Sequence, residues 1–182
     1  AKQTDVEGNV ALMGYDLSGR LVKVIQSASS PSYDNFFLTG DYGLTSYTPS
    51  SNADKDIITL YGYDAENNLV ASVDPLGNVD YTVYDGENRP IKVVSSAKAT
   101  ATIVLNPGDA SYDATNDPRS DSYVPSDDPD RDIIVVTEYD KMGRVIRTKQ
   151  LTETRPTAVW SVTLIGYDEE GRQVTRIGAA SA

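Results

Sequence analysis

Short apolar runs alternate with polar turn-forming residues along this chain, at the spacing of β-hairpins. Residues 21–25 read Leu-Val-Lys-Val-Ile and residues 145–147 read Val-Ile-Arg, and each run directly follows a polar turn. Short runs rich in β-branched residues and bounded by Gly, Asn and Asp are typical of strands. The pattern predicts an all-β protein built from tandem antiparallel β-hairpins.

One turn motif occurs five times. It begins with Tyr-Asp, has Gly or Asn three residues after the Asp, and continues with Arg or Asn. The Asp side chain accepts hydrogen bonds from backbone N–H groups in a type I turn, and Gly and Asn tolerate the positive φ that returns the chain to the sheet. We expect turns at 16–19, 64–67, 85–88, 140–143 and 168–171. The motif residues are Tyr15, Asp16, Gly19, Arg20, Tyr63, Asp64, Asn67, Tyr84, Asp85, Asn88, Arg89, Tyr139, Asp140, Gly143, Arg144, Tyr167, Asp168, Gly171 and Arg172.

A second, longer repetition groups the hairpins. The segment 74–78 precedes Tyr84 by the distance at which 5–9 precedes Tyr15, and residues 46–58 are similar to residues 122–134. Such internal repetition indicates a repeat architecture. We expect a first two-hairpin unit at 1–69 with an insertion at 26–54, a second at 70–147 with an insertion at 95–130, and the start of a third at 148–182. Because the repeat is cut at both ends, we expect the chain to be a piece of something longer.

In these residues the chain resembles the YD-repeat, or Rhs-repeat, family, whose signature is similar to Tyr-Asp-x-x-Gly-Arg-Leu with an Asp-Pro-Leu-Gly-Asn turn upstream. Residues 74–91 agree best with it, and residues 15–22 agree nearly as well. The resemblance implies side-by-side antiparallel hairpins in a curled, spiral β-sheet strip. Relatives would include bacterial Rhs and insecticidal toxin-complex shells, animal teneurins and wall-associated repeat proteins, in which the strip is a container or a scaffold.

Composition removes most enzyme classes. The chain has 182 residues with no Cys and no His, which excludes disulfides, thiol nucleophiles, Cys/His zinc sites and imidazole acid–base catalysis. Its net charge of −11 opposes binding to nucleic acid or to an anionic membrane. No apolar run approaches the roughly 18 residues that a membrane span needs. We expect a non-enzymatic protein with no nucleic-acid partner and no membrane span.

Aspartates gather in the two insertions, where residues 109–132 contain eight Asp against two Arg. We interpret the insertions first as solvated acidic loops that keep a sheet edge soluble. The alternative is a calcium site, because closely spaced carboxylates repel each other unless a cation lies among them, and Ca²⁺ prefers hard oxygen ligands. The candidate ligands are Asp128, Asp130 and Asp132 and, in the earlier copy, Asn52, Asp54 and Asp56. No other cofactor is expected.

The Tyr and Arg of each turn also have two interpretations. Because a tyrosine recurs at the same place in every hairpin, we expect the five rings to pack against neighbouring strands in a ladder and to be mostly buried. The alternative is a surface that stacks on glycans. Each Arg is expected to pair with a nearby carboxylate, such as the Asp of the preceding turn, rather than to form an anion site.

Three functions remain open. The first is a structural β-repeat unit of a secreted or cell-surface scaffold, bacterial or archaeal, that assembles end to end into a fibre, tube or stalk. Its partners would be copies of itself or adjoining repeats of a longer chain. The second is a fragment of an Rhs-type shell that encapsulates a toxin. The third is a glycan- or receptor-binding adhesin module with the insertions as contact loops.

Overall fold

The computed structural model describes residues 1–29, 40, 43–52, 54–97, 114–128, 130–153 and 158–181. These residues form antiparallel β-strands, which confirms the all-β prediction, and among them there is no helix that could cross a membrane. The strands are β1 (Lys2–Thr4), β2 (Val10–Tyr15), β3 (Leu21–Gln26), β4 (Ile57–Tyr63), β5 (Leu69–Val73), β6 (Val79–Tyr84), β7 (Pro90–Ala97), β8 (Ile133–Tyr139), β9 (Val145–Glu153), β10 (Val159–Tyr167) and β11 (Gln173–Ser181).

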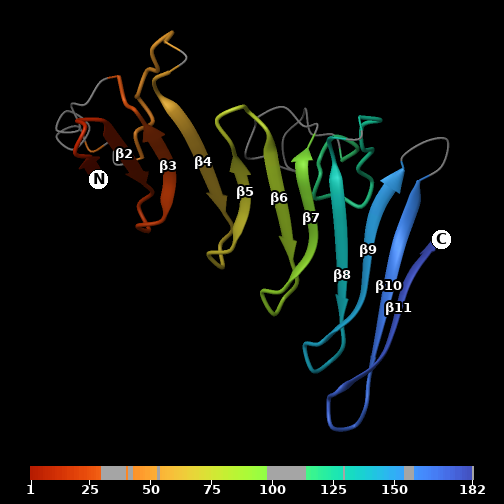
Figure 1. Ribbon diagram of the computed structural model, residues 1–182. Coiled ribbons are helices and arrows are strands. Elements are labelled where there is room, and N and C mark those ends of the chain that lie inside the picture. Colours follow the sequence, from red (N-terminus) through yellow and green to blue (C-terminus); the bar gives the residue numbers. More distant parts are fainter. Residues whose placement is uncertain are drawn as a thin grey trace. The chain divides into compact units, whose positions relative to one another are not determined.

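The strands belong to two compact units. Unit 1 comprises residues 1–62 and 72–77, and unit 2 comprises residues 63–71 and 78–182. In unit 1, strands β1 to β4 pair in chain order. Strands β6 to β11 of unit 2 do the same, and their Tyr-Asp turns lie at one end of the strands (Figure 1). The repeat boundaries and the curl of the strip stay predictions.

All five expected turns are present and share one geometry. In the turn at 140–143, the Gly143 N–H donates to the Asp140 carbonyl at 3.0 Å, and the Asp140 N–H donates to the Arg144 carbonyl at 2.9 Å. The pairing register shifts between Glu138 and Tyr139, as in a three-residue loop with a G1 bulge. The fourth turn position has positive φ in every copy, as the sequence predicted: 79° at Gly19, 71° at Asn67, 61° at Asn88, 79° at Gly143 and 80° at Gly171.

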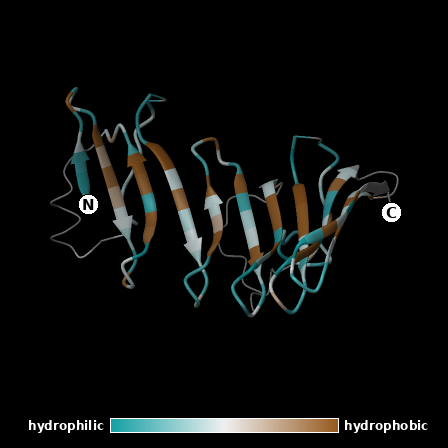
Figure 2. Ribbon diagram, turned by 60° about the horizontal axis from the view of Figure 1, so that its bottom comes forward, coloured by the Kyte–Doolittle hydropathy of each residue, from teal (hydrophilic) through white to brown (hydrophobic). Residues whose placement is uncertain are grey.

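One face of each unit carries the buried side chains. In unit 1, Leu12 pairs with Ile25, and neither side chain is exposed. In unit 2, Tyr81 pairs with Val94 and Val94 pairs with Ile134, so three buried side chains form a row across β6, β7 and β8. Figure 2 shows the hydrophobic stretches within the strands and the hydrophilic turns between them.

The interpretation of the insertions as solvated loops is wrong for their described inner parts. Leu44 has no exposed surface, and Tyr47 and its repeat equivalent Tyr123 are buried. A Cβ atom at Gly14 of β2 would lie 2.6 Å from the Gly43 carbonyl oxygen, so insertion and strand meet backbone to backbone. A lone sheet must bury its apolar face against another layer, and the insertions provide this cover. Among the described residues of the insertions, the exposed acidic side chains are those of Asp54, Asp121, Asp127, Asp128 and Asp130.

The turn tyrosines are partly buried, which agrees with the prediction that most of each residue is covered. Tyr15, Tyr63, Tyr84, Tyr139 and Tyr167 are all half-buried. Each is the last residue of its strand, directly before the turn. A tyrosine suits this place because its ring is apolar and its hydroxyl is polar.

We predict that Gly143→Val lowers the free energy of unfolding by about 1–2 kcal/mol, because a side chain at positive φ meets the following carbonyl oxygen. Gly86→Val is the matched control: Gly86 lies in a turn of the same type, has no positive φ, and has open space around its Cβ direction. Urea unfolding of both variants measures the difference. Equal losses would contradict the assigned turn geometry.

Candidate functional site

A charged pair locks four of the five Tyr-Asp hairpins internally. The Nε of the Arg four residues after the turn Asp donates to that carboxylate at 2.7 Å in the hairpins that begin at Asp16, Asp85, Asp140 and Asp168. The second carboxylate oxygen accepts backbone N–H groups, such as those of Met142 and Arg144 at 2.9 Å. In the remaining hairpin, which begins at Asp64, the Asn68 side-chain amide donates to the Asp64 carboxylate at 2.9 Å in place of a guanidinium.

These hydrogen bonds favour the ionised form of the four turn carboxylates that face an Arg. Donation from the backbone N–H and the guanidinium of the following Arg lowers the pKa of the four Asp side chains that face an Arg. The charge of each Asp therefore persists in mildly acidic solution, and the Arg side chain is held in one direction. That direction is across the sheet, toward the next hairpin.

Between hairpins, the held Arg contacts the Tyr of the next turn. The Arg89 guanidinium carbon lies 4.7 Å from the centre of the Tyr139 ring, and the Arg144 carbon lies 4.5 Å from that of Tyr167. The Tyr139 hydroxyl donates to the Pro90 carbonyl at 3.0 Å. The Tyr167 hydroxyl donates in the same way to the carbonyl of Val145, at 2.9 Å. We call this combination of Arg–ring stacking and Tyr hydroxyl hydrogen bond the tyrosine clamp.

The contact between the hairpins at 64–67 and 85–88 is a variant of the clamp. Here the Tyr84 hydroxyl donates to the Leu69 carbonyl at 3.2 Å. Asn68 takes the place of the Arg, and its amide donates to the Asn88 side-chain oxygen at 2.8 Å. The tyrosine-to-carbonyl bond is therefore common to all three junctions of unit 2 that the structure describes, and the partner beside it varies.

A second repeated contact fastens the insertions to the sheet. The Tyr47 hydroxyl donates to Asp56 in unit 1, and the Tyr123 hydroxyl donates to Asp132 in unit 2. In each copy a backbone N–H donates to the other carboxylate oxygen at 2.7 Å, from Ser50 or from Ser126. Both aspartates are buried and have positive φ. We call these two contacts the Tyr–Asp latches.

One lysine of the sheet reaches each insertion. The Lys23 ammonium donates to the Leu44 carbonyl, and the Lys92 ammonium donates to the Ser120 carbonyl, both at 2.7 Å. Burial lowers the pKa of Lys92, and the charges of Asp121 and Asp117 oppose that shift. The sequence showed that the two insertions are similar to each other. It did not show that each insertion packs on the sheet and is hydrogen-bonded to it.

The structure does not gather the candidate calcium ligands around one point. Asp56 and Asp132 face the latch tyrosines, whereas one Asp128 oxygen accepts the Asp130 N–H at 3.0 Å and the Asn52 oxygen accepts the Asp54 N–H at 3.0 Å. Among the described residues, no group of three acidic side chains is placed to hold a metal ion. Calcium binding at these six positions stays a prediction.

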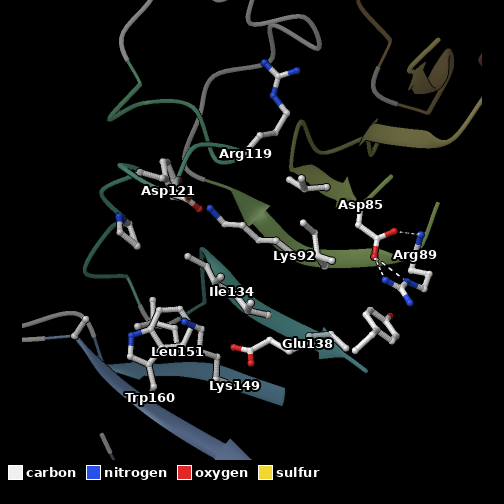
Figure 3. A pocket seen from close by; sticks show the side chains of 18 of the residues that line it. Asp85, Arg89, Lys92, Arg119, Asp121, Ile134, Glu138, Lys149, Leu151 and Trp160 are labelled. Carbon is white, nitrogen blue, oxygen red and sulfur yellow. Dashed lines mark hydrogen bonds and ion pairs between the residues drawn. The ribbon is translucent and has the colours of Figure 1, made fainter. Parts of the chain in front are cut away.

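Unit 2 also contains a cavity of about 780 Å³ between the insertion and strands β6 to β10. Figure 3 shows Lys92 extending toward Asp121, with Trp160 beside Leu151. The Lys149 ammonium lies 5.0 Å from the Trp160 ring centre. The cavity therefore combines one aromatic wall with charges of both signs. Glycan binding through the tyrosines or the insertions, the third open function, stays a prediction.

The fold and its contacts define a class of protein: tandem β-hairpins in which the turn residues of one hairpin hold the next. Within that class, residues 59–100 match the family described as RHS Repeat, which confirms the resemblance found in the sequence.

Two curated relatives match about half of the chain. Both are 32% identical to it over 97 residues: the tRNA3(Ser)-specific nuclease WapA of Bacillus spizizenii and the tRNA nuclease WapA of Bacillus subtilis. The match covers 53% of this chain and 4% of each relative. The chain thus corresponds to a small part of these proteins.

Solved structures of low similarity also match. One is the crystal structure of TcdB2-TccC3-TEV, at 13% identity and a TM-score of 0.37, covering 97% of this chain and 8% of the other. Another is a structure of the Photorhabdus luminescens Tc holotoxin pore, at 15% identity and a TM-score of 0.37, covering 96% of this chain and 8% of the other.

We predict that Asp56→Asn lowers the free energy of unfolding by about 2 kcal/mol at pH 7, because an amide replaces a charged acceptor of several hydrogen bonds. Burial alone would raise the pKa of Asp56, but hydrogen bonds from the Tyr47 hydroxyl and from the Ser29 and Ser50 N–H groups outweigh it and lower the pKa. The ionised carboxylate therefore stabilises the fold above the unfolded-state pKa of about 3.9, and this contribution is lost as pH falls through the lower folded-state pKa.

The difference between wild type and Asp56→Asn should accordingly shrink below about pH 4. Denaturant titrations at a series of pH values measure it. Asp54→Asn, at an exposed position of the same insertion, is the control and should change stability little at any pH. A pH-independent loss in Asp56→Asn would show that the carboxylate charge is not what fastens the insertion.

Proposed function

We propose that this chain is a segment of the wall of an RHS-type shell, a β-sheet strip that adjoining repeats of a longer chain extend until it encloses a cargo. The tyrosine clamp carries the proposal. Its Tyr hydroxyl bond recurs at the three described junctions of unit 2 and its Arg–ring stacking at two of them, so the same kind of contact can serve consecutive repeats. Such nearest-neighbour contacts are what a protein extended by repetition requires.

The insertions fit this role. A wall of one sheet layer has two faces and no second sheet to cover either one. The Tyr47–Asp56 latch and the buried Leu44 close one face of unit 1 with the chain's own residues. A strip covered in this way is stable along its length before the shell closes.

The names of the curated relatives do not assign their reaction to this segment. Both are named as tRNA nucleases, and the match reaches 4% of their length. The charge of −11 repels nucleic acid, and the chain has no His for acid–base catalysis. We therefore assign the segment a non-enzymatic, structural role in a secreted or cell-surface protein of a bacterium or an archaeon.

Electron microscopy tests the proposal. The chain expressed together with its adjoining repeats is expected to form hollow, closed particles of uniform size. The 182-residue chain alone is the matched control and is expected to stay free of long filaments. Filaments of the chain alone, with open strips from the longer protein, would contradict the shell and support end-to-end assembly into a fibre.

A further inference from the structure

The cavity of unit 2 has the insertion as its wall and one face of the sheet as its floor. Lys92 of β7 pairs with Val136 of β8, and Val136 pairs with Lys149 of β9, so the three side chains lie on the same face. Leu151 of β9 and Trp160 of β10 form a further pair on the floor. Strand β11 lies beyond β10, and none of its described residues lines the cavity. The cavity is therefore inside unit 2 and not at the edge of the sheet.

Most residues that line the cavity are apolar or aromatic. Ile134 and Leu151 of the floor are buried, and so is Tyr123 of the insertion. Val124, which follows Tyr123, also lines the cavity but is 55% exposed, so solvent reaches this part of the wall. The volume of about 780 Å³ is in the range of small-molecule sites. Walls of this kind suit a ligand whose body is apolar, because binding removes apolar surface from water.

The charged groups of the cavity differ in whether another charge neutralises them. Asp85 is held by the ion pair of its own turn, and Glu138 forms an ion pair with Arg147 at 3.1 Å. Lys149 differs from both: its ammonium lies 5.0 Å from the Trp160 ring centre, and among the described residues no carboxylate forms an ion pair with it. The cavity therefore presents a positive charge beside an aromatic wall.

Lys92 adds a second ammonium group on the same face. Two strand spacings, about 10 Å, separate its strand from that of Lys149. Its own ammonium donates to the Ser120 carbonyl at 2.7 Å. Burial lowers the pKa of Lys92 against the opposing charges of Asp121 and Asp117, and the positive charge of Lys149 lowers it further. An anion beside Lys149 would offset this repulsion between the two lysines.

We infer that this cavity binds a small organic anion, whose aromatic or aliphatic body lies against Trp160 and Leu151 and whose carboxylate or sulfonate group lies on the Lys149 ammonium. A sugar fits these walls less well. Its hydroxyl groups would each need a polar partner, and buried polar groups without one cost free energy. The inference concerns the 182-residue chain itself and does not depend on whether the strip closes into a shell.

Fluorescence titration with anilinonaphthalene sulfonate tests the site, because Trp160 is the one tryptophan of the chain. At about 0.15 M salt the net charge of −11 is screened beyond roughly 8 Å. We expect saturable binding with quenching of Trp160. Lys149→Met keeps the apolar stem and should weaken binding roughly tenfold, the loss of one charge-assisted contact. Lys141→Met, at an exposed position, changes the net charge equally and should bind like wild type.

A neutral probe separates the charge of Lys149 from its effect on the fold. Phenylnaphthylamine has the same aromatic body without the sulfonate, so Lys149→Met should leave its affinity unchanged. An equal loss for both probes would show that Lys149 only supports the cavity, and would overturn the inference. Val124→Asp provides a second test at an exposed position. Its added negative charge should weaken binding of the sulfonate more than binding of the neutral probe.

Competition identifies the class of ligand. Naphthoate is expected to displace the sulfonate probe, and its neutral counterpart naphthamide is not expected to do so at the same concentration. Displacement by glucuronate, a sugar acid without an apolar body, would assign the cavity to glycans and overturn the inference. Probe binding that leaves the Trp160 emission unchanged, or that Lys149→Met does not weaken, would overturn it as well.

Discussion

The ion pair between Asp and Arg, present in four of the five Tyr-Asp turns, is the contact on which the rest of this structure depends. Arg is a long side chain with much conformational freedom, and stacking it on a ring one hairpin away would cost that freedom. The turn Asp removes most of the freedom within the hairpin, because it holds the Nε of Arg144 at 2.7 Å while its other oxygen fixes the turn backbone. The guanidinium then lies where the ring of Tyr167 meets it. One carboxylate thereby shapes the turn and prepares the contact to the next hairpin.

A second constraint is the need to cover a single sheet layer. In a sandwich, another sheet would bury Leu12 and Ile25, whereas here Leu44 and Tyr47 from the insertion pack on them. Apolar packing alone would hold the insertion weakly. Hydrogen bonds from polar groups of the insertion to the strand ends hold it as well. The buried Asp56 accepts from Tyr47 on the insertion and from Ser29 beside β3, so one charged group ties the cover to the strand end. The same arrangement at Asp132 shows that this is a repeated device.

The sequence predicted local structure well and contacts between hairpins poorly. The turns were predictable because positive φ limits the choice of residue, and Gly or Asn stands at each fourth position. The Asp–Arg pair was predictable because its members lie four residues apart. The clamp was not, because Arg89 and Tyr139 are separated by an insertion of unknown path. The sequence does show that Tyr47 and Asp56 recur as Tyr123 and Asp132. Had this recurrence been interpreted as a Tyr–Asp hydrogen bond in each copy, it would have predicted the latches.

The most direct measurement is a double-mutant cycle between Arg144 and Tyr167, with Arg144→Ala, Tyr167→Leu and both changes together in the full chain. Leu keeps apolar bulk and removes the aromatic face, so the cycle isolates the stacking term of the clamp. The account predicts a favourable coupling free energy of about 0.5–1 kcal/mol. The same cycle between Arg89 and Tyr167, which belong to hairpins that are not neighbours, should give no coupling. Zero coupling between Arg144 and Tyr167 would contradict the claim that the turn arginine of one hairpin holds the next.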